Sequence, residues 1–271
     1  MESICSKKNS GYVQALKLKQ KRGRDKEGAL LVEGDNVVRE LLEQTDLVQR
    51  IYIRDDEHAA HLLQELLPRA DEANVTTCIL QRVLFDELAS TVTPQGVIGI
   101  IRKPDAIHLE DIFHRQRETE VAVVVLDRLQ DPGNVGTIIR TAIAAGFDAI
   151  VSMKGTVDIF SDKVIRSSTG LALKIPMIYS DSPNEFIQEA QAHKIKTIVC
   201  DMNAPHEYYD TDLTGSVAVV VGNEGNGTHP DFLSQAHSLI RISMVNSVES
   251  LNAAVTAGIV MYERVRQNKT K

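Results

Sequence analysis

The sequence has no tryptophan, and only six tyrosines and six phenylalanines occur among its 271 residues. It holds three cysteines, Cys5, Cys78 and Cys200, which are far apart and form no CxxC pair. An odd number of scattered thiols does not fit a closed disulfide framework. This cysteine usage is typical of a reducing compartment such as the cytosol.

Long apolar runs are also missing. The longest ones, at 121–126 and 217–221, are far shorter than the roughly 18 residues that span a membrane. Residues 1–20 contain lysines and no apolar segment, so they do not resemble a signal peptide. We therefore expect a soluble, cytoplasmic protein.

Charge is present in ordinary amount but is unevenly distributed. The whole chain has a net charge of −7, whereas residues 1–26 carry +6 and leave −13 for the rest. Such asymmetry suggests a basic arm directed at a polyanion. A solvated helix face is the alternative interpretation of the same pattern.

The length predicts about two domains. We expect a basic arm and a small α/β domain at 1–103, a charged linker at 104–120, and a second α/β domain at 121–271. Short apolar runs predict strands at 29–32, 48–53, 75–79, 97–101, 121–126, 149–151, 195–200, 217–221 and 239–242. These runs alternate with helical periodicity, which predicts a mainly parallel sheet covered by helices on both faces.

Ligands of such sheets bind at the carboxyl ends of the strands, where three unusual loops occur. In the first, 127–136, Pro132 and Gly133 form a turn before a helix that carries Asn134 and Arg140. The helix N-terminus could meet an anion, and Arg140 could hold a phosphate. Alternatively, Asn134 only caps the helix and Arg140 is a surface residue.

The second loop, 222–230, has three glycines in six residues, which lets the backbone approach a ligand closely. Its pattern is neither G-x-G-x-x-G nor a Walker A motif, so neither a dinucleotide fold nor an NTPase is indicated. Glu224 lies inside this tight loop, and it is either functional or merely an exposed acid. In the third loop, 243–252, Ser250 is predicted to cap a helix that places Asn252 in its first turn.

Metal-binding and hydrolase patterns are weak by comparison. His58 and His61 share a helical face without a third ligand at suitable spacing, so a solvated face is the preferred interpretation. We predict no metal site.

The three loops together resemble a known family. The order DPGNVGTIIRTAIAAG, VVVGNEGNG and IRISMVNSVESLNAAVTAGIVMYE resembles the signature motifs of the SpoU/TrmH family of RNA ribose 2′-O-methyltransferases, in the SPOUT superfamily. The segments LLVEG and TPQGVIGI resemble the N-terminal RNA substrate-binding domain of that family.

The resemblance implies a C-terminal trefoil knot, a homodimer and S-adenosylmethionine as methyl donor. It places the adenosine part of the donor at Gly222, Ile242 and Leu251. It places the polar groups of the methyl-transfer centre at Asn134, Arg140, Glu224, Ser250 and Asn252.

Arginine is effectively never deprotonated in proteins, so we expect Arg140 to fix a phosphate and stabilise the developing alkoxide rather than act as a base. We expect Asn134 and Glu224 to orient Arg140 or the ribose. The sulfonium is already a strong electrophile, so the reaction needs no metal.

The predicted function is methylation of a ribose 2′-hydroxyl, with ribosomal RNA (rRNA) preferred over transfer RNA (tRNA) because of the separate N-terminal domain. A non-catalytic RNA-binding protein with a relic donor pocket is a second hypothesis. A dehydrogenase-type nucleotide enzyme is a third, but the sequence lacks its fingerprint.

Overall fold

The computed structural model describes residues 2–44, 46–57, 59–114, 120–246 and 250–269. It divides into two compact units, Met1–Pro104 and Asp105–Lys271. No helix of the described segments is both long and apolar enough to cross a bilayer.

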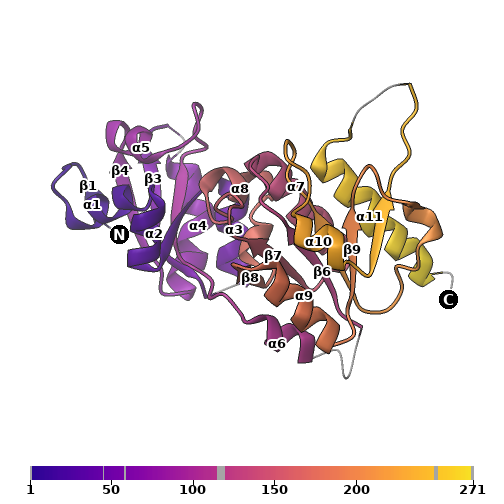
Figure 1. The fold of residues 1–271 in the computed structure, drawn as a ribbon. Helices are drawn as coiled ribbons and strands as arrows, with labels where there is room; N and C mark the ends of the chain where they lie inside the picture. The colour runs from indigo at the N-terminus through magenta and orange to yellow at the C-terminus, as the bar shows by residue number, and fades with distance from the viewer. Residues whose placement is uncertain (1, 45, 58, 115–119, 247–249, 270–271) are drawn as a thin grey trace. The chain divides into compact units, whose positions relative to one another are not determined.

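The N-terminal unit contains a mixed five-stranded sheet in the order β1-β4-β3-β5-β2. Its strands are β1 Glu2–Ile4, β2 Ala29–Glu33, β3 Val48–Asp55, β4 Thr76–Gln81 and β5 Val97–Arg102. Its helices are α1 Ser10–Lys17, α2 Lys21–Glu27, α3 Asp35–Gln44, α4 Ala59–Glu72 and α5 Arg82–Leu88. Strand β4 pairs in parallel with β1 and β3, whereas β5 pairs antiparallel with β2 and β3. This part of the chain combines helices and strands, as its sequence predicts (Figure 1).

The basic segment at the N-terminus is folded onto this unit. It forms β1, α1 and α2, and its residues Ile4, Tyr12 and Leu18 are buried in the core. The Tyr12 hydroxyl donates to the Leu84 carbonyl at 3.2 Å and to the Glu87 carboxylate at 3.1 Å. Strand β1 and this contribution to the core are not evident from the sequence, because lysines dominate the pattern of this segment.

The two family-like segments of the N-terminal unit pair along β2 and β5, and the Gly34 N–H donates to the Val97 carbonyl at 3.2 Å. Side chains beside them add further hydrogen bonds. The Glu33 carboxylate accepts hydrogen bonds from the Ser90 N–H at 2.7 Å and from Thr91. The Gln95 side chain accepts from the Asp35 N–H at 3.0 Å. The LLVEG and TPQGVIGI segments are therefore parts of one local structure.

The C-terminal unit is built on a seven-stranded sheet in the order β10-β12-β9-β11-β6-β7-β8, in which every strand pair is parallel. Its strands are β6 Ala122–Leu126, β7 Ala149–Met153, β8 Met177–Ser180, β9 Lys196–Cys200, β10 His206–Glu207, β11 Val217–Val221 and β12 Ser238–Arg241. Every residue of β6, β7 and β11 is buried, as continuous apolar runs predict. Strands β8 and β10 were not predicted.

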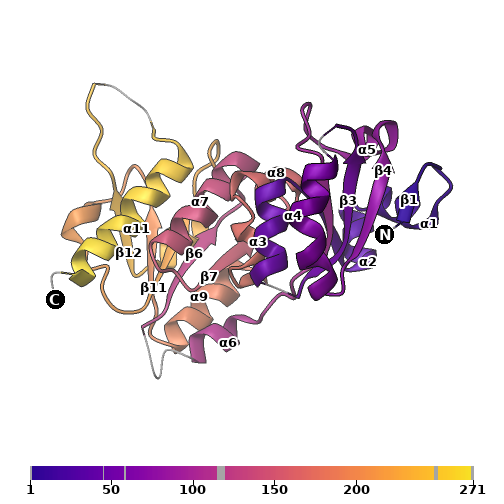
Figure 2. The same ribbon diagram turned by 180° about the vertical axis from the view of Figure 1, so that it is seen from behind.

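Helices cover both faces of this sheet, which confirms the predicted fold class. The α-helices are α6 Leu109–Phe113, α7 Pro132–Ala144, α8 Asp162–Ser167, α9 Pro183–Ala192, α10 Pro230–Gln235 and α11 Ala253–Lys269, and η2 Leu171–Leu173 and η3 Tyr208–Asp210 are 3₁₀ turns. Helices α6, α9 and α10 contribute Phe113, Phe186 and Phe232 to one core cluster with Val123 and Val125 of β6. Helices α7 and α11 pack against each other over the other face (Figure 2). The predicted linker at 104–120 thus includes α6, which packs into this core, while 115–119 lie outside the described residues.

The C-terminal helix α11 buries a face that overlaps only partly with the one that its sequence predicts. Helical spacing in the sequence predicts an apolar stripe through Leu251, Ala254, Val255, Gly258, Ile259, Tyr262 and Val265. In the structure Val255 and Tyr262 are each 50% exposed, whereas Ala257, Val260 and Met261 are buried. Within the predicted stripe, Ala254 is buried and a Cβ on Gly258 would lie 3.8 Å from the Thr141 methyl group of α7, so the prediction is wrong in only part of its length, at Val255 and Tyr262.

Candidate active site

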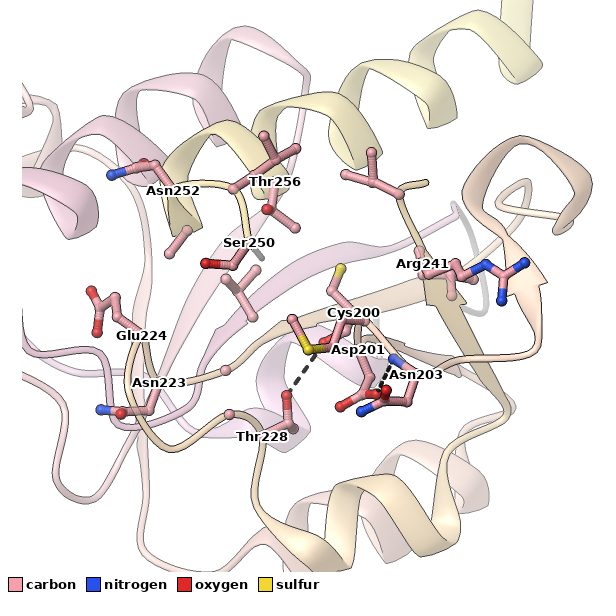
Figure 3. Close-up of a pocket in the computed structure, with 18 of the residues that line it drawn as sticks. Cys200, Asp201, Asn203, Asn223, Glu224, Thr228, Arg241, Ser250, Asn252 and Thr256 are labelled. Carbon is pink, nitrogen blue, oxygen red and sulfur yellow. Dashed lines mark hydrogen bonds between the residues drawn. The ribbon is translucent and has the colours of Figure 1, made fainter. Parts of the chain in front are cut away.

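A cavity of about 650 Å³ opens at the carboxyl ends of β9, β11 and β12 (Figure 3). Its walls come from 200–203, 221–228, 240–242 and 250–253, together with Met244, Thr256 and Val260. Parallel strands bring these loops to one edge of the sheet although they lie far apart in the sequence. Residues 247–249 of the third predicted loop lie outside the described residues.

All three residues predicted to hold the adenosine, Gly222, Ile242 and Leu251, line this cavity. Gly222 is also required by the fold, because a Cβ there would lie 2.3 Å from the Thr228 hydroxyl oxygen and 2.6 Å from the Thr228 backbone nitrogen. The glycine loop is closed by paired backbone hydrogen bonds between Asn223 and Gly227, at 3.2 and 3.0 Å. The loop is therefore a tight, preformed wall of the cavity.

A hydrogen-bonded chain connects the three predicted loops at the edge of the cavity. The Asn252 Nδ2 donates to Asn134 Oδ1 at 2.8 Å, and Asn134 Nδ2 donates to Glu224 Oε1 at 3.0 Å. The backbone N–H of Gln130 donates to the other carboxylate oxygen of Glu224 at 3.3 Å. The structure thus brings together three of the five residues predicted for the methyl-transfer centre.

Asn134 is not the cap of helix α7. The Asp131 carboxylate accepts from the Asn134 N–H at 2.8 Å and occupies the capping position. Pro132 follows at the first helical position, where a missing N–H costs nothing. The Asn134 carboxamide is therefore available to bridge the loops, and the capping alternative is wrong.

The electrostatics of the site keep Glu224 ionised. Partial burial raises the pKa of this carboxyl, but hydrogen bonds from the Asn134 amide and from nearby backbone N–H groups outweigh it. The net effect holds the Glu224 pKa below its ordinary value. At neutral pH the group is a carboxylate that accepts hydrogen bonds.

Asn252, and not Ser250, caps helix α11. Its Oδ1 accepts from the backbone N–H groups of Ala254 at 2.9 Å and Val255 at 3.3 Å, and the helix begins at Ala253. The predicted cap at Ser250 was wrong because the helix begins later than its apolar pattern suggests. Ser250 instead lines the cavity beside Asn252 (Figure 3).

Arg140 is placed apart from the other predicted site residues. It is an exposed residue of α7 and is not among the residues that line the cavity. Within the described part of the chain, its guanidinium makes no hydrogen bond or ion pair. The structure therefore does not join Arg140 to Asn134 or Glu224 within one chain.

The sequence analysis missed an ion pair that holds two of the loops together. Asp127 follows β6, is 1% exposed, and accepts from Arg128 Nε at 2.9 Å and from the His229 N–H at 2.7 Å. The same guanidinium donates to the Gly227 carbonyl at 3.1 Å. One signal in the sequence could have identified this ion pair. Asp127 directly follows a buried strand, at the edge of the sheet where ligands bind.

Arg128 also connects the loops through its backbone. Its φ of +58° is left-handed, an uncommon conformation for a residue with a side chain. In this conformation its carbonyl accepts hydrogen bonds from the side chains of Asn223 at 2.6 Å and Gln130 at 2.9 Å. Arg128 therefore fixes the positions of the loops that carry Glu224 and Asn134.

Cys200, Asp201 and Asn203 lie at another part of the cavity wall (Figure 3). Burial raises the pKa of the Cys200 thiol to about 12, so it stays protonated and is a poor nucleophile. The Asp201 carboxylate accepts from the Asn203 N–H at 2.8 Å.

Potential metal ligands do not gather in the structure. No group of three His, Cys, Asp or Glu suited to a metal occurs among the residues described. His61 is exposed and lies 3.6 Å from Glu65, as expected for a solvated face, and His58 lies outside the described residues.

Comparison with known families matches both units. Residues 121–262 match the SpoU rRNA methylase family, and residues 12–99 match the MRM3-like substrate binding domain.

Individual proteins are similar over almost the whole chain. The 23S rRNA (guanosine(2553)-2′-O)-methyltransferase RlmP of Bacillus subtilis is 31% identical over 97% of this chain and 98% of its own. The 23S rRNA (guanosine-2′-O-)-methyltransferase RlmB of Neisseria meningitidis is 29% identical over 83% of this chain and 89% of its own. The AdoMet-bound rRNA methyltransferase of Sinorhizobium meliloti is 26% identical, covers 98% of both chains, and superimposes with a TM-score of 0.83.

Proposed function

Because the chain belongs to the SpoU rRNA methylase family, we infer that it transfers the methyl group of S-adenosylmethionine to a ribose 2′-hydroxyl of RNA. Ribosomal RNA is the substrate class, since the relatives RlmP and RlmB act on 23S rRNA. The single observation that carries this function is the Asn252–Asn134–Glu224 chain at the edge of a closed-loop cavity.

The cavity has the chemistry that the methyl donor requires. Ile240, Ile242 and Leu251 offer apolar walls to a flat adenine ring, and the glycine loop offers backbone groups to its polar edge. When bound, S-adenosylmethionine supplies an electrophilic methyl group on a sulfonium. We assign Gly222, Ile242 and Leu251 to holding the adenosine part.

The polar residues hold the acceptor in place. Glu224, ionised and fixed by Asn134 and Gln130, retains lone pairs that can accept a hydrogen bond from the ribose. Reacting atoms must be held about 3–3.5 Å apart, which this network of short hydrogen bonds would support. Ser250 and Asn252 shape the loop around the donor.

Arg140 is assigned to the phosphate beside the reacting ribose and to the developing alkoxide. Its unpaired, exposed guanidinium supports a role toward a ligand outside its own chain. Helix α11, next to α7, exposes Val255 and Tyr262, which supports a homodimer formed through this face. Such a dimer would place Arg140 close to the interface.

Three further assignments complete the proposal. The protein acts in the cytoplasm, where its substrate is made, and is a homodimer whose mass can be measured by light scattering. The C-terminal unit carries the trefoil knot of the superfamily. The donor-binding residues would then lie on the knotted loops.

One experiment tests the function directly. Methyl transfer from labelled S-adenosylmethionine to total RNA, followed by mapping of the modified ribose, should place the label on a 2′-oxygen of rRNA. Label in tRNA would select the alternative substrate. Donor binding without transfer to either RNA would identify a non-catalytic RNA-binding protein.

A further inference from the structure

Seven of the eight basic residues of 1–26 fall into two groups by their contacts, and the eighth, Lys8, is exposed in the turn between β1 and α1. Lys7 lies 2.6 Å from the Glu87 carboxylate. Lys19 donates to the backbone carbonyls of Glu87 at 2.8 Å and Ala89 at 3.0 Å. These carbonyls lie at the C-terminal end of α5, where a positive charge stabilises a helix.

Arg24 serves the same purpose at α1. Its side chain is largely buried, and its Nη1 donates to the carbonyls of Leu18 and Lys19, both at 3.1 Å. Lys7, Lys19 and Arg24 therefore stabilise the N-terminal unit itself.

The second group consists of exposed side chains on α1 and α2. Lys17 ends α1, Lys21 begins α2, and Arg22 and Lys26 lie on the side of α2 opposite the buried Arg24; all four side chains are exposed. None of these four side chains forms a hydrogen bond or ion pair with another described residue. We call them the α1–α2 basic surface.

Contacts between the two helices hold the four charges close together. Gly23 packs so tightly against the end of α1 that a Cβ there would lie 1.9 Å from the Lys17 carbonyl oxygen. At the other end of α2, the Gln14 side chain donates to Glu27 at 2.8 Å. Lys17 is thereby fixed beside the helix that carries the other three charges.

The neighbouring acids do not neutralise this surface. Asp25 is 2.6 Å from the Lys103 ammonium, which together with the charge of the nearby Lys21 holds the Asp25 pKa below its ordinary value. Glu27 accepts from the neutral Gln14 amide and keeps its own charge, so the four cations still outnumber the acids beside them. The four cations are left to attract an external anion.

We propose that Lys17, Lys21, Arg22 and Lys26 dock the phosphate backbone of the RNA substrate, outside the methyl-transfer site. This rests on the proposed function, because the anion is taken to be the RNA that is methylated. Flexible lysines act as point charges, which suits phosphates that carry no sequence information.

The aromatic residues of the unit favour backbone contacts over other modes of binding. Tyr12, Tyr52 and Phe85 are its only tyrosines and phenylalanines, and all three are 0% exposed. Base readers stack bases on exposed aromatic rings, and protein interfaces are enriched in aromatics and poor in lysine. The α1–α2 basic surface fits neither pattern.

The test compares three variants of the full chain for binding to purified 23S rRNA and to poly(U) over a range of salt concentrations. The first replaces Lys17, Lys21, Arg22 and Lys26 with Ala. The slope of log affinity against log salt should fall by about 0.7–0.9 for each lost phosphate contact, or roughly 3 in total.

Two matched variants locate the effect. Lys17→Arg, Lys21→Arg, Arg22→Lys and Lys26→Arg together keep the charge and should preserve the slope. Lys7→Ala with Lys19→Ala, in the same segment, should lower the melting temperature but leave the slope nearly unchanged. An unchanged slope in the four-alanine variant would overturn the proposal, as would an equal loss in the Lys7 and Lys19 variant.

Further readouts separate this inference from the function. The four-alanine variant should still bind S-adenosylmethionine normally and methylate RNA when RNA is saturating at low salt. Loss of binding to assembled ribosomal subunits, with binding to naked rRNA unchanged, would overturn the RNA assignment in favour of a protein partner. Absence of methyl transfer by the unaltered protein would refute the function while leaving the binding result valid.

Discussion

The two units use polar side chains in opposite ways. In the C-terminal unit, Asn134, Glu224 and Asn252 come from three distant loops and are hydrogen-bonded to one another. In the N-terminal unit, Lys17, Lys21 and Arg22 are exposed and make no hydrogen bond or ion pair with a described residue. Methyl transfer requires atoms held at fixed distances, whereas phosphate attraction requires only charge within reach.

The two units also differ in the direction of the strands in their sheets. The C-terminal sheet is parallel throughout, so its loops converge at one edge and can share a cavity. The N-terminal sheet is mixed, and the proposed binding surface lies on helices added to it. The effect of a substitution in the C-terminal unit should therefore depend on whether it preserves the positions of the site residues. The effect of a substitution on the α1–α2 basic surface should depend on whether it preserves the charge.

Substitution of Arg140 should give the largest change in the methylation rate. This residue is the exception to the contrast between the units, because it is an exposed cation without a described partner in the C-terminal unit. If it stabilises the alkoxide, Arg140→Ala should lower single-turnover methylation by about 10²–10³, as for loss of one oxyanion donor. Arg140→Lys should rescue poorly, since a point charge lacks the planar fork. Donor affinity, measured in parallel by calorimetry, should barely change.

Near-normal turnover of Arg140→Ala would remove this residue from the mechanism. A surface arginine without a role would change stability by less than about 0.5 kcal/mol and leave the rate unaltered.

Arg128 tests whether the fixed loops depend on a buried charge. Arg128→Ala leaves Asp127, which is 1% exposed, without its cation, and should lower the free energy of unfolding by about 2–3 kcal/mol. Chemical denaturation measures this loss. Adding Asp127→Asn should recover part of it, and two strictly additive losses would contradict the pairing.

Gly136 tests whether the close packing of α7 requires a residue without a side chain. A Cβ at Gly136 would lie 1.9 Å from the Ser167 hydroxyl oxygen and 2.8 Å from the Ser168 backbone nitrogen. Gly136→Ala should therefore destabilise the protein by about 1–3 kcal/mol through overpacking. Gly258→Ala on α11 is the matched control, because its Cβ meets only an ordinary contact, and it should stabilise the helix by about 0.5–1 kcal/mol. Equal melting temperatures for the two variants would show that the close contact is absent.

The smallest predicted effect is a shift in the titration of Glu224. Its pKa is held below the ordinary value, so the carboxylate persists at neutral pH and is lost only as the pH falls through that lowered value. Asn134→Ala removes the largest hydrogen-bond contribution, so the Glu224 pKa should rise and the loss should occur at higher pH. Carboxyl NMR with Glu224→Gln as the assignment control measures the shift. Thr137→Ala, on the same helix, should leave it unchanged.

Much of the C-terminal unit was predictable, because continuous apolar runs and the glycine loop are local signals. The segment 121–126 predicted a buried strand, and strand β6 occupies it. The N-terminal segment was harder to predict. Its eight basic residues look alike in the sequence. Only their contacts in the structure distinguish Lys19 and Arg24, which stabilise the unit, from Lys21 and Arg22, which are exposed.

Errors also arose where a tertiary contact overrode a local pattern. Ser250 was predicted as a cap from its place before an apolar run, yet Asn252 caps the helix. Periodicity predicts one apolar face for helix α11, yet Tyr262 on that face is half-exposed while Gly258 lies against Thr141 of α7.

The sequence by itself determined the alternation of strands and helices, the three loops, and the residue types that can bind a methyl donor and an anion. These depend on spacing and side-chain chemistry, which are local properties of the chain. The tertiary structure alone decided that Asn134 bonds to Glu224, that Arg128 holds two loops together, and that Lys17, Lys21, Arg22 and Lys26 make no hydrogen bond or ion pair with a described residue. Those facts depend on which distant groups meet in space, because a hydrogen bond forms only within about 3 Å and no pattern along the chain encodes that distance.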